Sequence, residues 1–280
     1  MGTTQLDAMP ERIDDAITGS AFVEDAALRW ERPAGAGRAR FSLLLREREE
    51  AIVAEVLAGN VPSFGRTFWE VPLTHLAPQH TASVWVLADY LAIGSDDDFL
   101  RVPLSPISAT LLAGQLGCVL PTKRIVDAIY GADGVQRLPA IGMPPPGAEM
   151  TSLRRAKAHH DRIEAARAGA PGDLLAGHKK DVVVAWRLAQ VSEKVAIYGF
   201  FAASKPIQSL QLPHPDWYSD YSHGIRLVRE VMTVDGEERL VDDVLRDPVL
   251  HRLLTDPPGD QGPYPVTRYP IREIPDEVCP

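Results

Sequence analysis

The sequence predicts an α+β fold, in which helices of the N-terminal half pack on a mostly antiparallel β-sheet in the C-terminal half. Two observations lead to this prediction. Before residue 170, several segments repeat apolar residues at helical spacing. After residue 178, short runs rich in Val, Ile, Leu and Tyr alternate with turn residues, as antiparallel strands do. The 280 residues, of which 45% are hydrophobic, are enough for a full core.

We expect residues 1–280 to form one α+β domain. Residues 1–20 are polar and are expected to be mobile. Residues 256–280 contain many prolines and are expected to form an extended C-terminal arm. Residues 21–34 are expected to add an early edge strand or a short helix before Pro33 and Gly35.

A helix is predicted over residues 38–59. Its apolar stripe consists of Ile52, Val53, Val56 and Leu57, and Gly59 supplies a stop signal. The charged residues at 46–50 are expected to form the solvated face of this helix. Between residues 68 and 102 the pattern changes to strands, with a hairpin turn at the Asp-rich segment 94–98.

Three more helices have recognisable starts. Ser105 precedes a proline and is expected to cap a helix that runs to Gly117. Thr122 is expected to cap the next helix. A polar helix is predicted over 151–169, and its two adjacent histidines, His159 and His160, are expected to be solvated.

The C-terminal half is predicted to contain an antiparallel meander of four strands. These are VVVAW (182–186), VAIYGF (195–200), PIQSL (206–210) and YSHGIRLV (221–228). A further hairpin is predicted at Asp235-Gly236, the dipeptide that two-residue hairpin turns favour.

Charge and composition restrict the partners. A formal net charge of −9 argues against nucleic acid or an anionic membrane as the main partner. No apolar run is long enough to span a membrane, and the first residues lack the pattern of a signal peptide. The two cysteines, Cys118 and Cys279, form no disulfide framework, so a cytoplasmic location is expected. No oligomeric state is predicted.

Residues 178–228 contain the strongest candidates for a functional site. Three of the eight histidines fall in this segment, at 178, 214 and 223, together with Trp186 and Trp217. The polar run His178–Asp181 lies at the start of a strand, where side chains can face a cleft. The link at 212–221 is rich in aromatic and hydrogen-bonding groups, as a loop lining a substrate site is.

Ser222-His223-Gly224-Ile225-Arg226-Leu227 resembles the Ser-His-Gly-Cys-X-Arg-Leu motif of L,D-transpeptidases of the peptidoglycan cross-linking type. The strand pair before it, VAIYGF and PIQSL, also resembles the strands before that motif. In that family a cysteine nucleophile follows the glycine, whereas this chain has Ile225 there. The resemblance therefore implies a histidine placed as a general base but no thioester chemistry.

From these residues we expect a hydrolase or acyl-transfer enzyme that acts on a small polar substrate and needs no cofactor. His223 is the first candidate for the acid/base, with Asp220 or Asp181 as the carboxylate that orients its ring. Ser222 points to the other face of the strand from His223, so as a nucleophile it would need His178 or His214 as its base. The candidates for binding substrate are Lys180, Arg226, Tyr198, Tyr221 and Trp217. This scheme expects His178 and His223 to open into one water-accessible hollow.

Two alternatives stay open. His214-Pro215-Asp216 has the His-X-Asp form of a 2-His-1-carboxylate metal site, which a further histidine would complete with a divalent metal ion. Alternatively, the aromatic residues of this segment would hold a small molecule without catalysis. Nucleotide cofactors are not expected, because no Gly-rich phosphate-binding loop is present.

Overall fold

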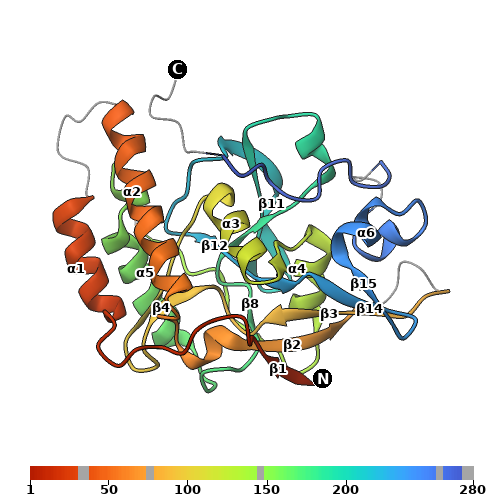
Figure 1. Cartoon of the computed structure of the whole chain (residues 1–280), viewed down its shortest axis with the longest axis horizontal. Coiled ribbons are helices and arrows are strands. Elements are labelled where there is room, and N and C mark those ends of the chain that lie inside the picture. The colour runs from red at the N-terminus through yellow and green to blue at the C-terminus, as the bar shows by residue number, and fades with distance from the viewer. Residues whose placement is uncertain (31–37, 74–78, 144–147, 257–260, 273–280) are drawn as a thin grey trace.

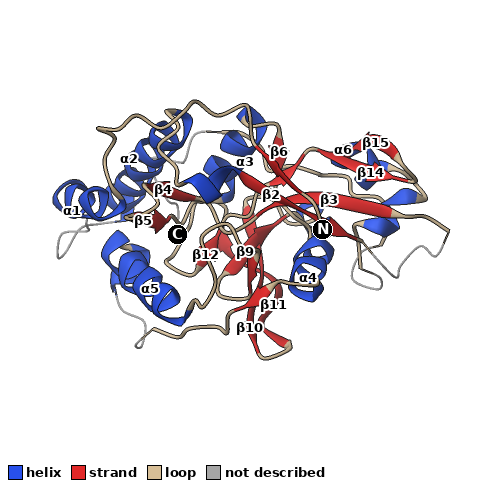
Figure 2. Ribbon diagram, turned by 90° about the horizontal axis from the view of Figure 1, so that it is seen from below, coloured by secondary structure: helices blue, strands red, loops and turns tan. Residues whose placement is uncertain are grey.

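The computed structural model describes residues 1–30, 38–73, 79–143, 148–256 and 261–272. The fold is α+β, with five of the six described helices before residue 170, as predicted. The helices are α1 (Gly19–Arg29), α2 (Arg38–Leu57), α3 (Pro106–Gln115), α4 (Lys123–Gly131), α5 (Leu153–Ala166) and α6 (Val241–Arg246). Helices α1, α2 and α5 lie together at one end of the molecule, and β14, β15 and α6 lie at the other (Figures 1 and 2).

Most helices begin where the sequence places a cap. Ser105 and Thr122 accept hydrogen bonds from the backbone amides of Ser108 and Ile125, and so cap α3 and α4 as predicted. In α2, Ile52 and Val56 are fully buried, which confirms the apolar stripe. For residues 21–34 the sequence allowed either an edge strand or a short helix. Of these, residues 21–29 belong to α1, whose N-cap is Thr18.

The larger sheet is antiparallel and has the order β1-β2-β3-β13-β6, with β14 also paired to β3 and β15 paired to β14. Its strands are β1 (Thr3–Gln5), β2 (Thr67–Pro72), β3 (Ala82–Leu87), β6 (Cys118–Val119), β13 (Val228–Arg229), β14 (Val231–Val234) and β15 (Glu237–Leu240). Residues 3–5, inside the segment expected to be mobile, pair with β2. Asp235 and Gly236 both have positive φ angles (52° and 85°), which confirms the predicted hairpin.

The second sheet has the order β11-β10-β9-β12 and carries the candidate site. Its strands are β9 (Lys180–Val183), β10 (Lys194–Ala202), β11 (Lys205–Pro215) and β12 (His223–Gly224). Strands β9, β10 and β11 are antiparallel, but β12 pairs with β9 in parallel, so the predicted four-strand meander is wrong in its last strand. After β11 the chain crosses to the far edge of the sheet, beyond β9. The hairpin of β10 and β11 projects from the body of the molecule (Figure 2).

Two short strand pairs complete the described part of the chain. They are the hairpin of β4 (Ala92–Gly94) and β5 (Phe99–Arg101), and the parallel pair β7 (Gln136–Arg137) and β8 (Leu175–Ala176). One hydrophobic cluster contains residues from Leu6 to Tyr269 and includes side chains of both larger sheets. Of the expected C-terminal arm, residues 261–272 form neither helix nor strand and bury Tyr264 and Tyr269.

Two expectations about polar residues are wrong. His159 and His160 on α5 are buried, with exposed fractions of 0% and 5%, because this face of α5 packs against the core. In the charged run of α2, Arg48 and Glu49 are also buried, at 3% and 0%. Their polar groups are satisfied inside the fold by Ser219 and Ser105. Both pairs have partners from distant parts of the chain.

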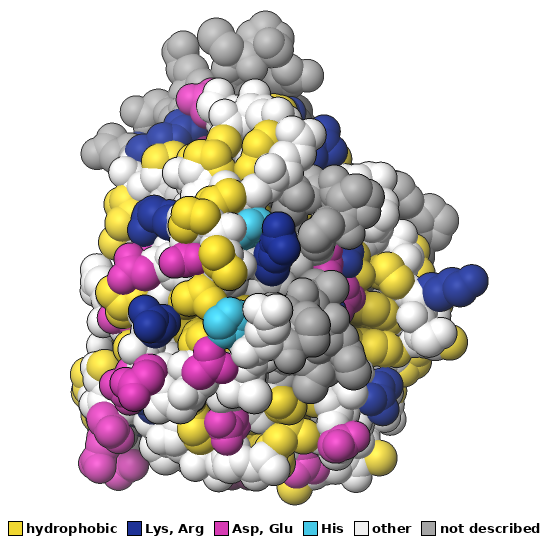
Figure 3. All heavy atoms as spheres, turned by 90° about the vertical axis from the view of Figure 1, so that its right-hand side faces the viewer, with side chains coloured by type: hydrophobic (Ala, Val, Ile, Leu, Met, Phe, Trp, Pro, Cys, Tyr) yellow, Lys and Arg dark blue, Asp and Glu magenta, His cyan; other side chains and the backbone are white. Residues whose placement is uncertain are grey.

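The surface over β14, β15 and α6 carries acidic side chains with lysines and arginines among them (Figure 3). Side chains of both charge signs are therefore mixed on this face. Among the helices in the described ranges, none combines the length and the apolar character needed to cross a bilayer.

Candidate functional site

His223 occupies β12 and is fully buried. In the parallel ladder it lies opposite Lys180 of β9, so the two side chains share one face of the sheet. Its ring is 6.3 Å from the ring of His214 and 5.9 Å from that of Tyr218, measured between centroids. His214 and Tyr218 are only partly buried, so the group approaches the surface at these two rings.

Asp220 supplies the carboxylate of this group and is 2% exposed. Its Oδ1 accepts hydrogen bonds from the amide of Ser222 (2.8 Å) and from the Ser222 hydroxyl (2.6 Å). Burial alone would raise the pKa of Asp220, but His223, Lys180 and the bonds from Ser222 bring it below its usual value. Asp220 is therefore ionised at neutral pH.

The His223 ring is held neutral. Burial lowers its pKa to about 4; Asp220 works against this shift and Lys180 adds to it. Within the described part of the chain, neither Nδ1 nor Nε2 of His223 has a hydrogen-bond partner. A neutral imidazole with an uncommitted lone pair is the form that a general base requires.

His178 lies in a separate polar group at the start of β9. The ring is fully buried, and its Nε2 is 3.3 Å from Oδ1 of Asp89, without the alignment of a good hydrogen bond. Arg101 donates to Oδ2 of Asp89 from Nε (2.9 Å) and Nη2 (2.5 Å). The edge of the His178 ring meets the ring of Tyr90 at 4.9 Å. Burial lowers the pKa of His178 to about 4, so this ring is also neutral at pH 7.

Lys179 lies between the two groups. Its Nζ is fully buried and donates to the backbone oxygen of Tyr221 at 2.8 Å. Burial and the charge of Arg101 lower the pKa of Lys179 to about 7, while Asp220 and Asp89 oppose this shift. The expectation that His178 and His223 open into one water-accessible hollow is wrong, because both rings are 0% exposed and contact different neighbours.

Asp181 and Arg226 belong to the interior beside Tyr90. Oδ2 of Asp181 accepts the Tyr90 hydroxyl at 2.8 Å, and burial raises the pKa of Asp181 to about 7. Arg226 donates to the backbone oxygens of Leu87 (2.8 Å) and Leu175 (2.6 Å), and its guanidinium lies 4.3 Å from the Tyr90 ring centroid. These bonds tie β3 and β8 together, which favours a structural role for Arg226 over substrate binding.

The aromatic candidates are dispersed. Tyr198 donates its hydroxyl to Asp127 at 2.7 Å, away from the His223 group. Tyr221 packs edge-on against His159, at 5.1 Å between ring centroids. Trp217 contacts Tyr218 at 6.4 Å and is thus the one of the three predicted aromatics that adjoins a ring neighbour of His223.

The alternative metal ligands are not placed together as a ligand set. Both carboxylate oxygens of Asp216 accept from Nη2 of Arg272, at 2.6 and 2.8 Å. The ring of His214 instead stacks near Tyr218, at 4.4 Å. Among the residues that the structure describes, no three His, Cys, Asp or Glu side chains lie close enough to hold a metal ion.

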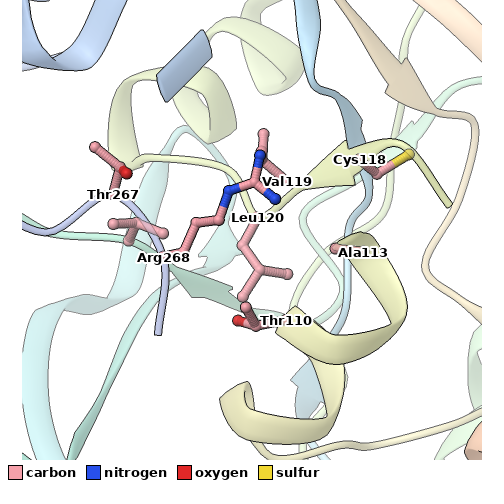
Figure 4. A pocket seen from close by; sticks show the side chains of 8 residues that line it. Thr110, Ala113, Cys118, Val119, Leu120, Thr267 and Arg268 are labelled. Carbon is pink, nitrogen blue, oxygen red and sulfur yellow. The ribbon is translucent and has the colours of Figure 1, made fainter. Parts of the chain in front are cut away.

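Cys118 lines a pocket whose lining includes none of His223, His214, Tyr218, Asp220 and Lys180 (Figure 4). Its lining comes from α3, β6 and the C-terminal segment, and includes Thr110, Leu120 and Arg268. The sulfur of Cys118 points away from the labelled side chains across the pocket (Figure 4) and contacts the Leu116 carbonyl at 3.4 Å. Burial raises the pKa of this thiol to about 12, so it is protonated and unsuited to act as a nucleophile. Cys279 lies outside the described residues.

Some polar residues near the site were not predicted from the sequence. Asp89 stands inside the apolar run VWVLADYLAIG, and a lone carboxylate in such a run indicates a buried partner. His160 has helical spacing with the buried residues Leu153, Ala156 and Ile163, which would have placed it on the inner face of α5. No local signal in the sequence identifies Arg48 or Glu49 as buried.

The chain is thus an α+β protein in which the buried ring of His223 lies within electrostatic reach of the buried Asp220 carboxylate. Compared with known proteins, it matches no protein-family model, no curated protein and no solved structure.

Proposed function

We propose that this chain is a hydrolase or acyl-transfer enzyme acting on a small polar substrate, with His223 as general acid/base and Asp220 as its carboxylate partner. The observation that carries the proposal is the His223 ring itself. It is buried and neutral, its two nitrogens have no partner among the described residues, and an ionised carboxylate lies nearby. Most buried side-chain polar atoms in proteins have at least one hydrogen-bond partner, so a buried imidazole with none among the described residues is unusual.

Water is the nucleophile that this arrangement favours. The Ser222 hydroxyl is already donated to Asp220 at 2.6 Å, so it is committed to that carboxylate. His223 would take a proton from water as the oxygen attacks the acyl carbon, and then pass that proton to the leaving group. The ammonium of Lys180, on the same face as His223, would bind a carboxylate or the developing oxyanion. The proton transfer needs no cofactor.

The test uses p-nitrophenyl acetate, an activated ester whose hydrolysis releases a coloured phenolate. His223→Asn keeps a side chain of similar polarity but cannot shuttle a proton at neutral pH. We expect it to lose about 100-fold or more of kcat/KM, the usual contribution of a general base. The matched control is His80→Asn, because His80 forms an exposed pair with Asp235 and should not affect turnover.

Equal activity of the His223→Asn and wild-type proteins would overturn the proposal. No turnover by the wild type, together with retained binding of a small ester, would favour a non-catalytic binding protein. Loss of activity with a chelator and its return with a divalent metal would instead favour the metal-dependent alternative. A cytoplasmic location and a small-molecule partner, without nucleic acid, remain predictions that accompany this proposal.

A further inference from the structure

We propose that Glu49, on α2, is a positioning residue for the candidate site, acting through Ser219 on the segment that carries Asp220 and His223. This inference rests on the proposed function for its effect on turnover, but not for its effect on the geometry of His223.

The carboxylate of Glu49 accepts three hydrogen bonds from two serines. Its Oε1 accepts from the amide of Ser105 (2.8 Å) and from the hydroxyl of Ser219 (3.0 Å), and its Oε2 accepts the Ser105 hydroxyl (2.6 Å). The exposed fraction is 0% for Glu49, Ser105 and Ser219 alike. One carboxylate therefore joins the start of α3 to the site segment.

Arg48 completes the contact from the same turn of α2. Its Nη2 donates to the Ser219 hydroxyl at 3.1 Å, and its Nη1 donates to the backbone oxygen of Thr151. The Ser219 hydroxyl thus accepts from Arg48 and donates to Glu49, which fixes both its position and its orientation. Hydrogen bonds to charged groups are the stronger ones, so Ser219 is held firmly.

Ser219 is joined to the candidate site by the backbone of only four residues, 220–223. Asp220 follows directly in the chain and bonds to the amide and hydroxyl of Ser222. The amide of His223 donates to the backbone oxygen of Asp220 at 3.0 Å. A shift of Ser219 would therefore move Asp220 relative to the His223 ring, and displacements of about 1 Å can cost on the order of 100-fold in rate.

Glu49→Gln tests this inference, because it removes the negative charge beside Arg48 and leaves one acceptor oxygen where the carboxylate has two. The matched control is Glu50→Gln, the next residue of α2, whose side chain is 69% exposed and pairs with Arg46. We expect Glu49→Gln to shift the His223 ring signals in a carbon–proton NMR spectrum at pH 7. In p-nitrophenyl acetate hydrolysis we expect kcat to fall between about 10- and 100-fold with KM nearly unchanged. Glu50→Gln should change neither quantity.

Two further variants separate positioning from a general loss of stability. Ser219→Ala removes the link to the site and should reproduce both effects, and combining it with Glu49→Gln should add little more. Ser105→Ala removes the hydroxyl that donates to Oε2 of Glu49 and caps α3, but it keeps the amide that donates to Oε1. It should therefore lower Tm but leave the His223 signals in place. Unmoved His223 signals in a folded Glu49→Gln protein, or an equal shift in Ser105→Ala, would overturn the inference. If the wild type shows no turnover, the proposed function fails while the NMR comparison still decides on positioning.

Discussion

At the scale of single residues, the pKa of His223 is set by burial and by two charged neighbours that act in opposite directions. Burial disfavours the imidazolium, Asp220 favours it, and Lys180 on the same face of the sheet disfavours it. The balance gives a pKa of about 4, well below that of a solvated histidine. His178 reaches a similar value in a different environment, so burial is the main cause in both.

The contribution of Lys180 can be tested by Lys180→Met. Removing its positive charge should raise the pKa of His223 above about 4, because the imidazolium then lies beside Asp220 without a competing cation. An NMR titration of the His223 ring measures this change. Lys194→Met is the control, since Lys194 acts on His214 and should leave His223 unchanged. A lower pKa in Lys180→Met would contradict this account of the site.

At the scale of elements, the starts of α3 and α4 and the β14–β15 turn could be predicted from the residues next to them in the sequence. Ser105 and Thr122 cap their own helices, and Asp235-Gly236 defines its own hairpin, so a few adjacent residues suffice to predict them. The parallel pairing of β12 with β9 depends on where the chain crosses after β11, which no local pattern encodes. The burial of Arg48 and Glu49 on α2 was missed for the same reason. The burial of His160 on α5, by contrast, could have been inferred from its helical spacing with Leu153, Ala156 and Ile163.

The buried histidines of α5 predict acid sensitivity. Burial lowers the pKa of His160 to about 2, and in the unfolded chain the value returns to about 6.5. Between these values the unfolded state binds more protons, so stability is full above pH 6.5 and falls as the pH falls. His160→Gln removes this titration and keeps an acceptor for Arg101. Near pH 5, the slope of the unfolding free energy against pH should be smaller in His160→Gln than in the wild type, by about 1.4 kcal/mol per pH unit.

Urea denaturation at several pH values between 5 and 7 measures this difference. A His160→Gln protein with the same slope as the wild type would mean that His160 is not buried in its neutral form.

At the scale of the whole molecule, the segment from β11 to β12 is held from three distant parts of the chain. Arg272 binds Asp216, the α2 pair binds Ser219, and the backbone oxygen of Met150 accepts from the amide of Tyr221. The fold class and the segment that holds His223 could be predicted, because strand patterns and polar clusters are visible along the chain. The contacts that fix this segment could not, because their partners lie up to 171 residues apart.

The tail contact is tested by Arg272→Ala. It leaves the Asp216 carboxylate, which is 1% exposed, without its charged donor, and should cost about 2 kcal/mol of unfolding free energy. Adding Asp216→Asn removes the unpaired charge and should recover part of that loss. Urea denaturation of both variants checks this expectation. Equal stability of wild type and Arg272→Ala would show that Arg272 does not hold Asp216 in solution.

The dependence of kcat/KM on pH for p-nitrophenyl acetate hydrolysis tests most directly whether His223 is the working base. A base must be neutral to accept a proton, and the His223 ring is neutral at every pH well above 4. We therefore predict a rate that is constant from pH 8 to pH 5 and falls only toward pH 4, while circular dichroism confirms a folded chain. A fall centred near pH 6.5 would contradict the account, because it would assign the reaction to a solvated histidine.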